Sequence, residues 1–394
     1  MNGIEAKAGL GVNVHVYPST FEFESRMDRA GRALVGAGLF SEVVFVGVWR
    51  LGLEEWELGE SGVEICRLRG RLNSDRQNLL YRLLRFLEWS GLILGRFRGE
   101  KLSCINCHSL SAFPACVVLR FLTGARLIYD AHELETETES MRGGRKWLAK
   151  LVEWVCIHEA DAHVFVSDSI ANWYRDRFGL RRVYVVRNVP LQSKRNEGDV
   201  GKDLRRIFGI GGNALVCLHQ GRLEAGRGVE RMLDAFTGLP ERCHLVLLGF
   251  GELVGWIREK AAQCSNIHYH EPVSPDELPS LTQGADLGLH LIGDTCLNHL
   301  FCLPNKLFEY THAGVPVVFS DLPEVDRVVT GYGCGWTVKD STENLREKIL
   351  EIDGEDLKRA KEGCQKVAEE CNWEREREVM LGIYSGLGFV SNGG

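Results

Sequence analysis

Short apolar segments of strand length alternate with longer helix-like segments along the whole chain. In the first half, the segments that predict strands are 12–16, 43–48, 127–129, 162–166 and 183–186. Residues 26–37 are amphipathic and predict a helix that ends at Gly38, a residue type that commonly caps helix C-termini. This alternation is typical of a parallel sheet with helices on both of its faces.

The pattern breaks near residue 190 and restarts after a charged segment. Residues 192–203 show no hydrophobic periodicity and are predicted to be a linker. Further strands are predicted at 214–218, 245–248, 267–269, 287–291 and 315–319. Residues 343–370 are expected to be helical with an interruption at Gly354. We therefore expect an α/β protein with two Rossmann-like, doubly wound domains, 1–190 and 191–372, and a C-terminal helix (373–388) that packs on the first. Ligands of such sheets bind at the carboxyl ends of the strands.

Composition narrows the class of protein. The chain of 394 residues is 44% hydrophobic and 26% charged, as in ordinary globular proteins. The net charge of -7 argues against a nucleic acid partner, and no signal peptide or membrane-spanning segment is evident. Thirteen cysteines are interpreted as reduced thiols of a cytoplasmic protein. Cys104 and Cys107 have no second pair at zinc-site spacing, so no metal is expected there.

Residues 219–230, HQGRLEAGRGVE, carry the strongest chemical signal. Gly221 and Gly226 have the spacing of a nucleotide-triphosphate P-loop. However, Arg227 and Gly228 replace its lysine and its magnesium-binding hydroxyl, which disfavours a kinase or ATPase. Arg222 and Arg227 instead offer two guanidinium forks that suit a diphosphate beside a helix N-terminus. The alternative is a solvated basic start of a helix.

Glu309 lies in a predicted helix directly before the strand at 315–319. A carboxylate there can accept hydrogen bonds from both hydroxyls of a ribose. Taken by itself, it is more typical of a surface position on a helix. The arginine pair in the same half of the chain favours the ribose interpretation.

Several motifs together resemble glycosyltransferase family 4. They are Gly221-Arg222 with a basic residue at 227, the turn 249–252 (GFGE) and the run 304–310 (PNKLFEY). Upstream, residues 130–133 (DAHE), 160–167 (ADAHVFVS) and 186–189 (VRNV) are similar as well. The resemblance covers nearly the whole chain and implies the GT-B fold and a reaction that retains anomeric configuration.

The resemblance also implies roles for individual residues. Arg222 and Arg227 correspond to the basic pair that binds the donor diphosphate, Glu309 to the ribose ligand, and His132 to a histidine that contacts the transferred sugar. The expected catalytic residues are thus His132, Arg222 and Arg227. The expected donor-binding residues are Gly221, Arg222, Arg227, Gly249, Gly251, Asn305, Lys306 and Glu309. Ser25, Arg26 and His108 are expected on the acceptor side.

Two departures from the family pattern bear on the sugar. Members often carry a Glu-x7-Glu pair, and Phe301 stands where the first glutamate is expected. The chain is therefore similar to the subgroup that lacks this acid, and the donor sugar stays unnamed. The usual Gly-Gly near the N-terminus is also absent, and the loop 18–26 takes its place.

The function implied is retaining transfer of a sugar from a UDP- or GDP-linked donor to an acceptor hydroxyl, in polysaccharide, glycolipid or glycoconjugate biosynthesis. We expect no cofactor and no metal, because two arginines can stabilise the charge on the leaving diphosphate. The alternatives are a nucleotide-sugar epimerase of the same fold and a catalytically impaired, nucleotide-sugar-binding pseudoenzyme.

Residues 67–101 form a basic stretch in an acidic protein. The stretch contains nine arginines and lysines and three acidic residues, with leucine, phenylalanine and tryptophan between them. Peripheral contact with an anionic membrane requires such a pattern, and it would favour a lipid-linked acceptor and a place at the inner face of the membrane. The alternative is a core-facing helix with a solvated basic face and a soluble sugar acceptor.

Overall fold

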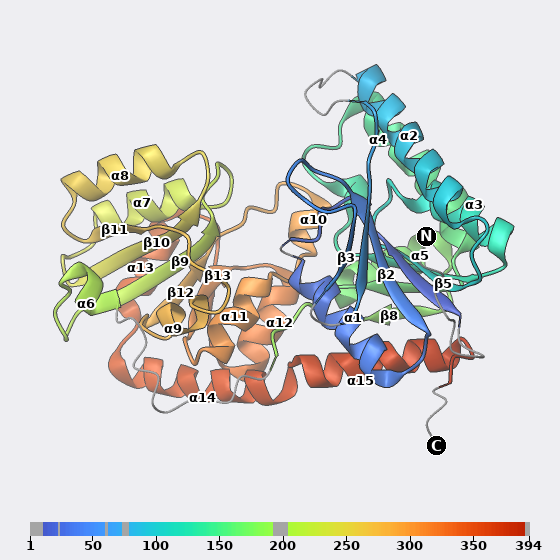
Figure 1. Cartoon of the computed structure of the whole chain (residues 1–394). Coiled ribbons are helices and arrows are strands. Elements are labelled where there is room, and N and C mark those ends of the chain that lie inside the picture. The colour runs from blue at the N-terminus through green and yellow to red at the C-terminus, as the bar shows by residue number, and fades with distance from the viewer. Residues whose placement is uncertain (1–10, 23, 60–61, 73–78, 192–203, 391–394) are drawn as a thin grey trace. The chain divides into compact units, whose positions relative to one another are not determined.

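The structure is a computed structural model that describes residues 11–22, 24–59, 62–72, 79–191 and 204–390 (Figure 1). It divides into two compact units. Unit 1 comprises residues 1–187 and 377–394, and unit 2 comprises residues 188–376. Within the described residues, no helix combines the length and the apolar character that crossing a bilayer requires.

Unit 1 is built on an eight-stranded sheet with the order β3-β4-β2-β1-β5-β6-β7-β8. Its strands are β1 (Val12–Val16), β2 (Glu42–Val48), β3 (Trp56–Leu58), β4 (Glu64–Leu68), β5 (Leu102–Cys107), β6 (Arg126–Ala131), β7 (Ala162–Phe165) and β8 (Val183–Val185). The edge strand β3 is antiparallel to β4, and the remaining pairs are parallel. The carboxyl ends of the parallel strands therefore share one edge of the sheet.

The helices of unit 1 connect these strands. They are α1 (Ser25–Ala37), α2 (Leu79–Phe97), α3 (Phe113–Thr123), α4 (Gly143–Cys156) and α5 (Asp168–Phe178), with the short 3-10 turns η1 (Glu135–Glu137) and η2 (Ile157–Glu159). Helices α2, α3 and α4 are neighbours, and α3 packs on β5 and β6 (Figure 1). Helix α1 packs on β2 and ends at Gly38, which adopts the left-handed conformation predicted for a C-cap.

Helix α15 (Trp373–Gly386) contributes its residues from 377 onward to unit 1. The Tyr384 hydroxyl donates a 2.8 Å hydrogen bond to Asn106 Oδ1, and its ring meets Phe40 edge-on. Tyr384 is buried, so this contact fixes the end of the chain to the strand β5.

Unit 2 has a six-stranded, wholly parallel sheet with the order β11-β10-β9-β12-β13-β14. Its strands are β9 (Leu215–Arg222), β10 (Cys243–Phe250), β11 (Ile267–His270), β12 (Leu287–His290), β13 (Val317–Ser320) and β14 (Gly335–Val338). This is the doubly wound order in which the chain starts in the middle of the sheet and reverses direction beside its first strand.

Helices cover both faces of the second sheet (Figure 1). One group packs with the apolar core that includes Phe236, Leu247 and Leu289: α7 (Val229–Thr237), α8 (Val254–Gln263) and α13 (Thr342–Glu351). The others are α6 (Leu204–Phe208), α9 (Leu278–Thr282), α10 (Leu297–Leu300), α11 (Asn305–His312), α12 (Pro323–Tyr332) and α14 (Gly354–Glu370). Helix α14 packs on α11 and α12.

The predicted strands are all present, with small shifts at their ends. Strands β3, β4, β5 and β14 were not predicted from the sequence. The edge strand β3 is exposed along its length, so it carries no apolar alternation. Strand β5 contains Cys104 and Cys107, which are buried as thiols, and burial raises the pKa of both. The predicted interruption at Gly354 is the boundary between α13 and α14. The predicted linker 192–203 lies outside the described residues.

Candidate functional site

Two glycines bring the ends of β9 and β10 together at the carboxyl edge of the second sheet. Gly221 pairs directly with Gly249, and Arg222 pairs with Phe250. A Cβ atom on Gly249 would lie only 1.8 Å from the carbonyl oxygen of Gly221, and both residues have positive φ values. Only glycine fits this approach. The prediction that the strand ends at residue 218 was wrong, because pairing with β10 extends it to Arg222.

The segment that follows β9, residues 222–228, is here named the arginine loop. Arg222 donates to Glu224 at 2.8 Å, and Arg227 Nε lies 3.6 Å from the other oxygen of the same carboxylate. The two predicted diphosphate ligands are thus brought together around one acid. Their side chains are 58% and 46% exposed, so both guanidinium groups are accessible to a ligand.

Helix α11 adds an ammonium and a carboxylate at the same edge. A Cβ atom on Gly221 would lie 2.9 Å from Lys306 Nζ, which shows how close this ammonium is to the strand end. Glu309 accepts a 2.8 Å hydrogen bond from Gln220 Nε2, and Gln220 accepts in turn from Thr282 at 2.9 Å. The buried Gln220 therefore fixes the orientation of Glu309, the residue predicted to bind the ribose.

The electrostatics of this edge are those of a cationic site. Burial lowers the pKa of Lys306, the nearby Arg227 lowers it further, and Glu309 opposes both. Burial also lowers the pKa of His219 to about 4, helped by the charges of Lys306 and Arg227. Since the charges of Lys306 and Arg227 act on the same buried histidine, an anion bound there would be stabilised.

The remaining residues predicted to bind the donor lie around this edge. Gly251 has a positive φ, and a Cβ atom on it would lie 2.3 Å from the Leu223 carbonyl oxygen. Its neighbour Glu252 accepts from the backbone N–H of Ala225 in the arginine loop at 3.2 Å. Asn305 is exposed at the first turn of α11. Phe301, in the place of the absent acid, follows the short helix α10.

In unit 1, three histidines and an aspartate from the carboxyl edge of the first sheet form what is here named the histidine cluster: His15, His108, His132 and Asp130. His15 Nδ1 lies 2.9 Å from His108 Nε2, and His108 Nδ1 lies 3.1 Å from His132 Nε2 and 3.3 Å from Asp130 Oδ2. His15 and His108 are buried, whereas His132 retains partial exposure. His132 is thus the histidine of the cluster that a substrate can reach.

The hydrogen-bond partners in the histidine cluster determine which ring nitrogen of each histidine carries the proton. Asn106 Nδ2 lies 3.4 Å from His15 Nε2 and can only donate, so His15 carries its proton on Nδ1. His15 then donates to His108 Nε2, which leaves the His108 proton on Nδ1, facing His132 Nε2 and Asp130. His132 Nε2 can accept from it, which leaves the His132 proton on Nδ1.

Arg26 compensates the charge of Asp130 in the histidine cluster. Burial by itself would raise the pKa of Asp130, but the Arg26 guanidinium at 3.0 Å and then His108 outweigh it and hold that pKa well below its usual range. Burial lowers the pKa of His132 to about 3, with Arg26 and His108 acting in the same direction. His132 is therefore neutral near pH 7, and Asp130 is ionised.

The residues predicted on the acceptor side fall into two groups. Arg26 is buried and donates to the Val186 carbonyl oxygen at 2.9 Å as well as to Asp130, and both ring nitrogens of His108 face protein groups. His108 thus contacts His132 directly, and Arg26 is engaged by Asp130. Ser25 is exposed at the first residue of α1, one position before Arg26.

His108, Asp130 and His132 also offer three potential ligand atoms that lie within 4.8 Å of one another. A metal ion would compete there with the Arg26 guanidinium, which already compensates the Asp130 charge. The donor set is therefore better accounted for as a hydrogen-bonded network, and the expectation that the protein needs no metal stays a prediction.

Sequence reasoning missed several residues that shape these sites. Gln220 precedes the recognised Gly-Arg pair and gave no signal of its own, since its role depends on a helix 89 residues later. His15 lies in a predicted strand where a buried polar residue is unusual, and that anomaly was the available signal. Glu135 accepts from the backbone N–H of Leu110 at 2.6 Å, and burial raises its pKa to about 7.

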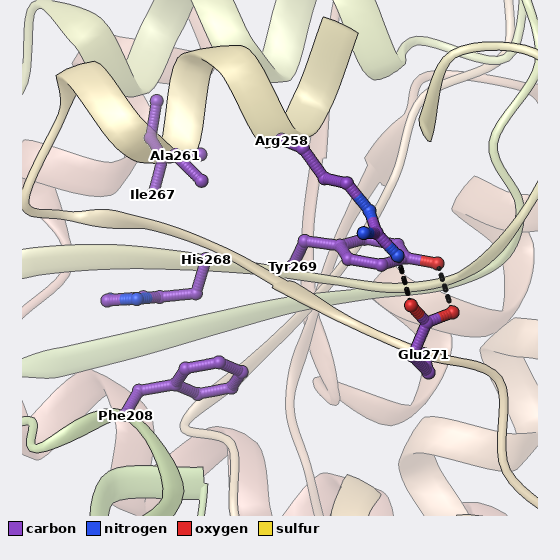
Figure 2. Close-up of a pocket in the computed structure, with 7 residues that line it drawn as sticks. All are labelled: Phe208, Arg258, Ala261, Ile267, His268, Tyr269 and Glu271. Atoms are coloured by element: carbon purple, nitrogen blue, oxygen red, sulfur yellow. Dashed lines mark hydrogen bonds and ion pairs between the residues drawn. The ribbon is translucent and has the colours of Figure 1, made fainter. Parts of the chain in front are cut away.

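A shallow hollow of about 400 Å³ lies along the edge strand of unit 2 (Figure 2). Figure 2 shows Arg258 and Tyr269 both directed at the Glu271 carboxylate, with Phe208 and His268 to their left. The Tyr269 hydroxyl also donates to the Gly249 carbonyl oxygen at 2.9 Å. Its lining includes none of the predicted donor-binding residues.

Both units of the chain match known protein families. Residues 8–189 match the sequence family described as Glycosyltransferase Family 4, and residues 214–353 match that described as Glycosyl transferases group 1. No curated protein matches the chain by sequence.

Solved structures of the same fold include a sucrose-phosphate synthase from Thermosynechococcus elongatus (TM-score 0.78, 14% identity, 96% of this chain and 99% of that chain covered). Anabaena HepE in complex with UDP-glucose is similar at a TM-score of 0.73 (15% identity, 95% and 100% covered). WaaG, a glycosyltransferase involved in lipopolysaccharide biosynthesis, is similar at 0.66 (16% identity, 97% and 100% covered).

Proposed function

The chain belongs to the family 4 type of glycosyltransferases with the GT-B fold, and on that premise we propose that it moves a sugar from a UDP- or GDP-linked donor to an acceptor hydroxyl with retention. The observation that carries this proposal is the convergence of Arg222, Lys306 and Glu309 on the Gly221 strand end. Those side chains match the two ends of a nucleoside diphosphate.

The first step in the proposed reaction is loss of the diphosphate from the sugar. Negative charge grows on the leaving phosphate as the glycosidic bond breaks, and Arg222, Arg227 and Lys306 stabilise it. Side chains thereby supply the charge stabilisation that a divalent metal supplies elsewhere. We propose that the reaction needs no metal and no further cofactor.

In the proposed reaction, Glu309 orients the ribose of the donor and His132 orients its transferred sugar. Glu309, held by Gln220, has one carboxylate oxygen engaged and can accept from the ribose with the other. His132 is neutral and offers an N–H to a sugar oxygen, which orients the transferred group without adding charge. Phe301 leaves the identity of that sugar open.

The direct test is turnover with candidate donors and acceptors. UDP- and GDP-linked sugars are incubated with and without sugar and lipid-linked acceptors, with and without EDTA, and the anomeric configuration of any product is read by NMR. We expect acceptor-dependent nucleotide release, retained configuration and no effect of EDTA.

The same assay separates the alternative functions. Donor that is epimerised in the absence of any acceptor would identify an epimerase. Binding of nucleotide without turnover on any acceptor would identify a pseudoenzyme, the alternative that Phe301 suggests because it stands in place of an acid. An inverted product would overturn the proposed retention while leaving the transferase intact.

We also propose that unit 1 contacts an anionic membrane through residues 67–101 and the helices beside them. Half of the 22 large apolar side chains that are exposed in the described chain lie on α2, α3 and α4. They are Leu83, Leu84, Leu87, Val118, Phe121, Leu122, Trp147, Leu148, Leu151, Trp154 and Val155.

The arrangement on α4 matches the requirement of an interfacial helix. Trp147, Leu151 and Trp154 recur at helical spacing, with Arg142 and Arg145 exposed at its start. On α2, Trp89 and Ile93 are buried while Leu83, Leu84 and Leu87 are exposed. The outer face of α2 is therefore apolar as well as basic, which favours membrane contact over a purely solvated face. This would place the protein at the cytoplasmic face of a membrane, with a lipid-linked acceptor.

Flotation with vesicles tests the membrane proposal. Binding to phosphatidylglycerol-containing vesicles and not to pure phosphatidylcholine is expected, with loss in the double variant Trp147→Ser, Trp154→Ser. Leu350→Ser, which changes an exposed leucine of α13, is the matched control. Equal binding of the double variant and the control would contradict the proposal.

A further inference from the structure

A hollow of about 830 Å³ opens at the carboxyl edge of the first sheet, apart from the donor-binding residues. Its wall comes from the loops that follow β1, β2 and β4, and from α2. At its rim, Ser111 Oγ lies 2.7 Å from Ser109 Oγ, next to His108 in the chain. The hollow thus begins where the loop from the histidine cluster ends, at the sheet edge where such folds bind ligands.

The hollow is strongly cationic in a protein of net charge -7. Its lining includes five arginines and a single acid, Glu88. The Glu88 carboxylate accepts the backbone N–H groups of Arg71 at 2.7 Å and Leu72 at 3.2 Å, so it is engaged in holding the turn after β4. The acid therefore shapes the hollow, and no ion pair joins it to Arg71 or Arg82 within the described residues.

The arginines differ in how firmly they are held. Arg50 pairs with Glu22 at 2.7 Å, and the Arg69 guanidinium lies 4.2 Å over the Trp49 ring. Among the described residues, the guanidinium groups of Arg71 and Arg82 have no acidic partner. These two are available to a ligand.

Aromatic side chains provide the other half of the lining. Phe86 and Trp89 follow Arg82 by four and seven positions on α2 and so share its face. Trp89 is fixed by donation of its Nε1 to the Gly47 carbonyl oxygen at 3.2 Å. With Trp49, over whose ring the Arg69 guanidinium lies, they give the hollow an aromatic lining of the kind that packs against a sugar ring.

We propose that this hollow binds the phosphate group of a phosphorylated sugar acceptor; the inference rests on the proposed transferase function and names its acceptor class. A neutral acceptor gains nothing from the charges of Arg71 and Arg82, whereas a phosphate accepts paired N–H donors from arginine. The phosphate can belong to a free sugar phosphate or to a sugar attached to a lipid through phosphate. Binding there holds the acceptor within the unit that carries His132.

Binding of three probes to the full-length protein tests the proposal. The soluble probes are inorganic phosphate and glucose 6-phosphate, with glucose as the neutral counterpart, and the third is phosphatidylcholine vesicles with phosphatidic acid added. Dissociation constants are measured for the wild type, Arg71→Ala, Arg82→Ala and the control Arg98→Ala, which changes an exposed arginine just beyond α2. UDP and GDP are titrated in parallel.

Binding of glucose 6-phosphate but not glucose, weakened about tenfold or more in Arg71→Ala and Arg82→Ala and unchanged in Arg98→Ala, supports a soluble phosphorylated acceptor. The same pattern with phosphatidic acid vesicles alone supports a lipid-attached phosphate. If UDP or GDP binds but no phosphate probe does, or if the Arg71 and Arg82 variants bind these probes like the wild type, the inference is wrong. Failure of every nucleotide to bind would instead count against the proposed function.

Discussion

The histidine cluster of unit 1 and the arginine loop of unit 2 present their chemistry in opposite ways. His15 and His108 are buried and bonded in series, so His132 is the one histidine of the cluster that is partly exposed. Arg222 and Arg227, in contrast, are about half exposed and both meet the Glu224 carboxylate. The first site is held by buried hydrogen bonds, and the second holds its cations with an exposed acid, which under the proposed function a diphosphate replaces.

The difference follows from the chemistry that each site handles. A neutral histidine has to be oriented, and a buried hydrogen-bond network orients it at little electrostatic cost. Guanidinium groups that bind a dianion cannot be buried without a partner, because an unpaired buried charge is strongly destabilising. An exposed internal acid resolves this while the donor is absent.

The largest effect is expected from removing one cation of the arginine loop. Arg222→Ala takes away a charge that acts on the leaving diphosphate, so kcat should fall about 10²–10³-fold. Acceptor-dependent nucleotide release measures it. Arg242→Ala is the matched control, because Arg242 is exposed just before β10, at the opposite edge of the sheet. Equal rates for the two variants would remove the arginine loop from catalysis.

A smaller effect, on the free energy of unfolding, tests whether water is excluded from the surroundings of the histidine cluster. Burial raises the pKa of Glu135 from 4.5 to about 7. The unfolded chain releases this proton first, so stability is full below about pH 4.5 and falls as pH rises to about 7. Glu135→Gln removes that loss and should stabilise the protein at pH 8 by on the order of 2–3 kcal/mol, but not at pH 4.

Denaturant unfolding at the two pH values measures this difference. Glu139→Gln, at an exposed position, should leave stability unchanged at both. A Glu135→Gln variant with the pH dependence of the wild type would mean that Glu135 is hydrated.

The next effect tests whether the series of histidines orients His132. His108→Ala should lower kcat roughly tenfold with little change in the KM for the donor, since misplacement of a contacting group slows the chemical step. His108→Asn should recover part of it, because its amide can donate toward His132. The ring nitrogen shifts of His132 in NMR should report one tautomer in the wild type and a mixture in His108→Ala. An unchanged tautomer would show that His108 has only a structural role.

The smallest effect addresses the acid in the arginine loop. Glu224→Gln keeps the shape but removes the charge that UDP or GDP has to displace, so the dissociation constant should fall about two- to fivefold, the range of an exposed ion pair. Calorimetric titration measures it. Weaker binding in Glu224→Gln would mean that Glu224 positions the arginines for the ligand and does not compete with it.

The sequence predicted the fold where the apolar periodicity was strong. Buried strands such as β2 and β10 and the C-cap at Gly38 were evident from local pattern alone. Strands β4 and β5 mix polar residues with apolar ones, and β3 is an exposed edge, so tertiary pairing determines them and local pattern does not.

The site was predictable where it depends on short motifs. Gly221, Arg222 and Glu309 stand in such motifs, and the structure brings them to one sheet edge. The support from Gln220, the direct pairing of Gly221 with Gly249, and the link from Tyr384 to Asn106 join residues 28 to 278 positions apart. No local pattern carries information about contacts of that span.

The most direct test of the central claim is thermal unfolding with UDP, GDP and ADP, in the wild type and in Arg222→Ala and Glu309→Gln. We expect UDP or GDP to stabilise the wild type by about 2.7 kcal/mol at a hundredfold excess over its dissociation constant, and both variants much less at the same concentration. If no nucleotide stabilises the wild type, or if the variants respond like it, a nucleotide-sugar site at Arg222 and Glu309 is contradicted.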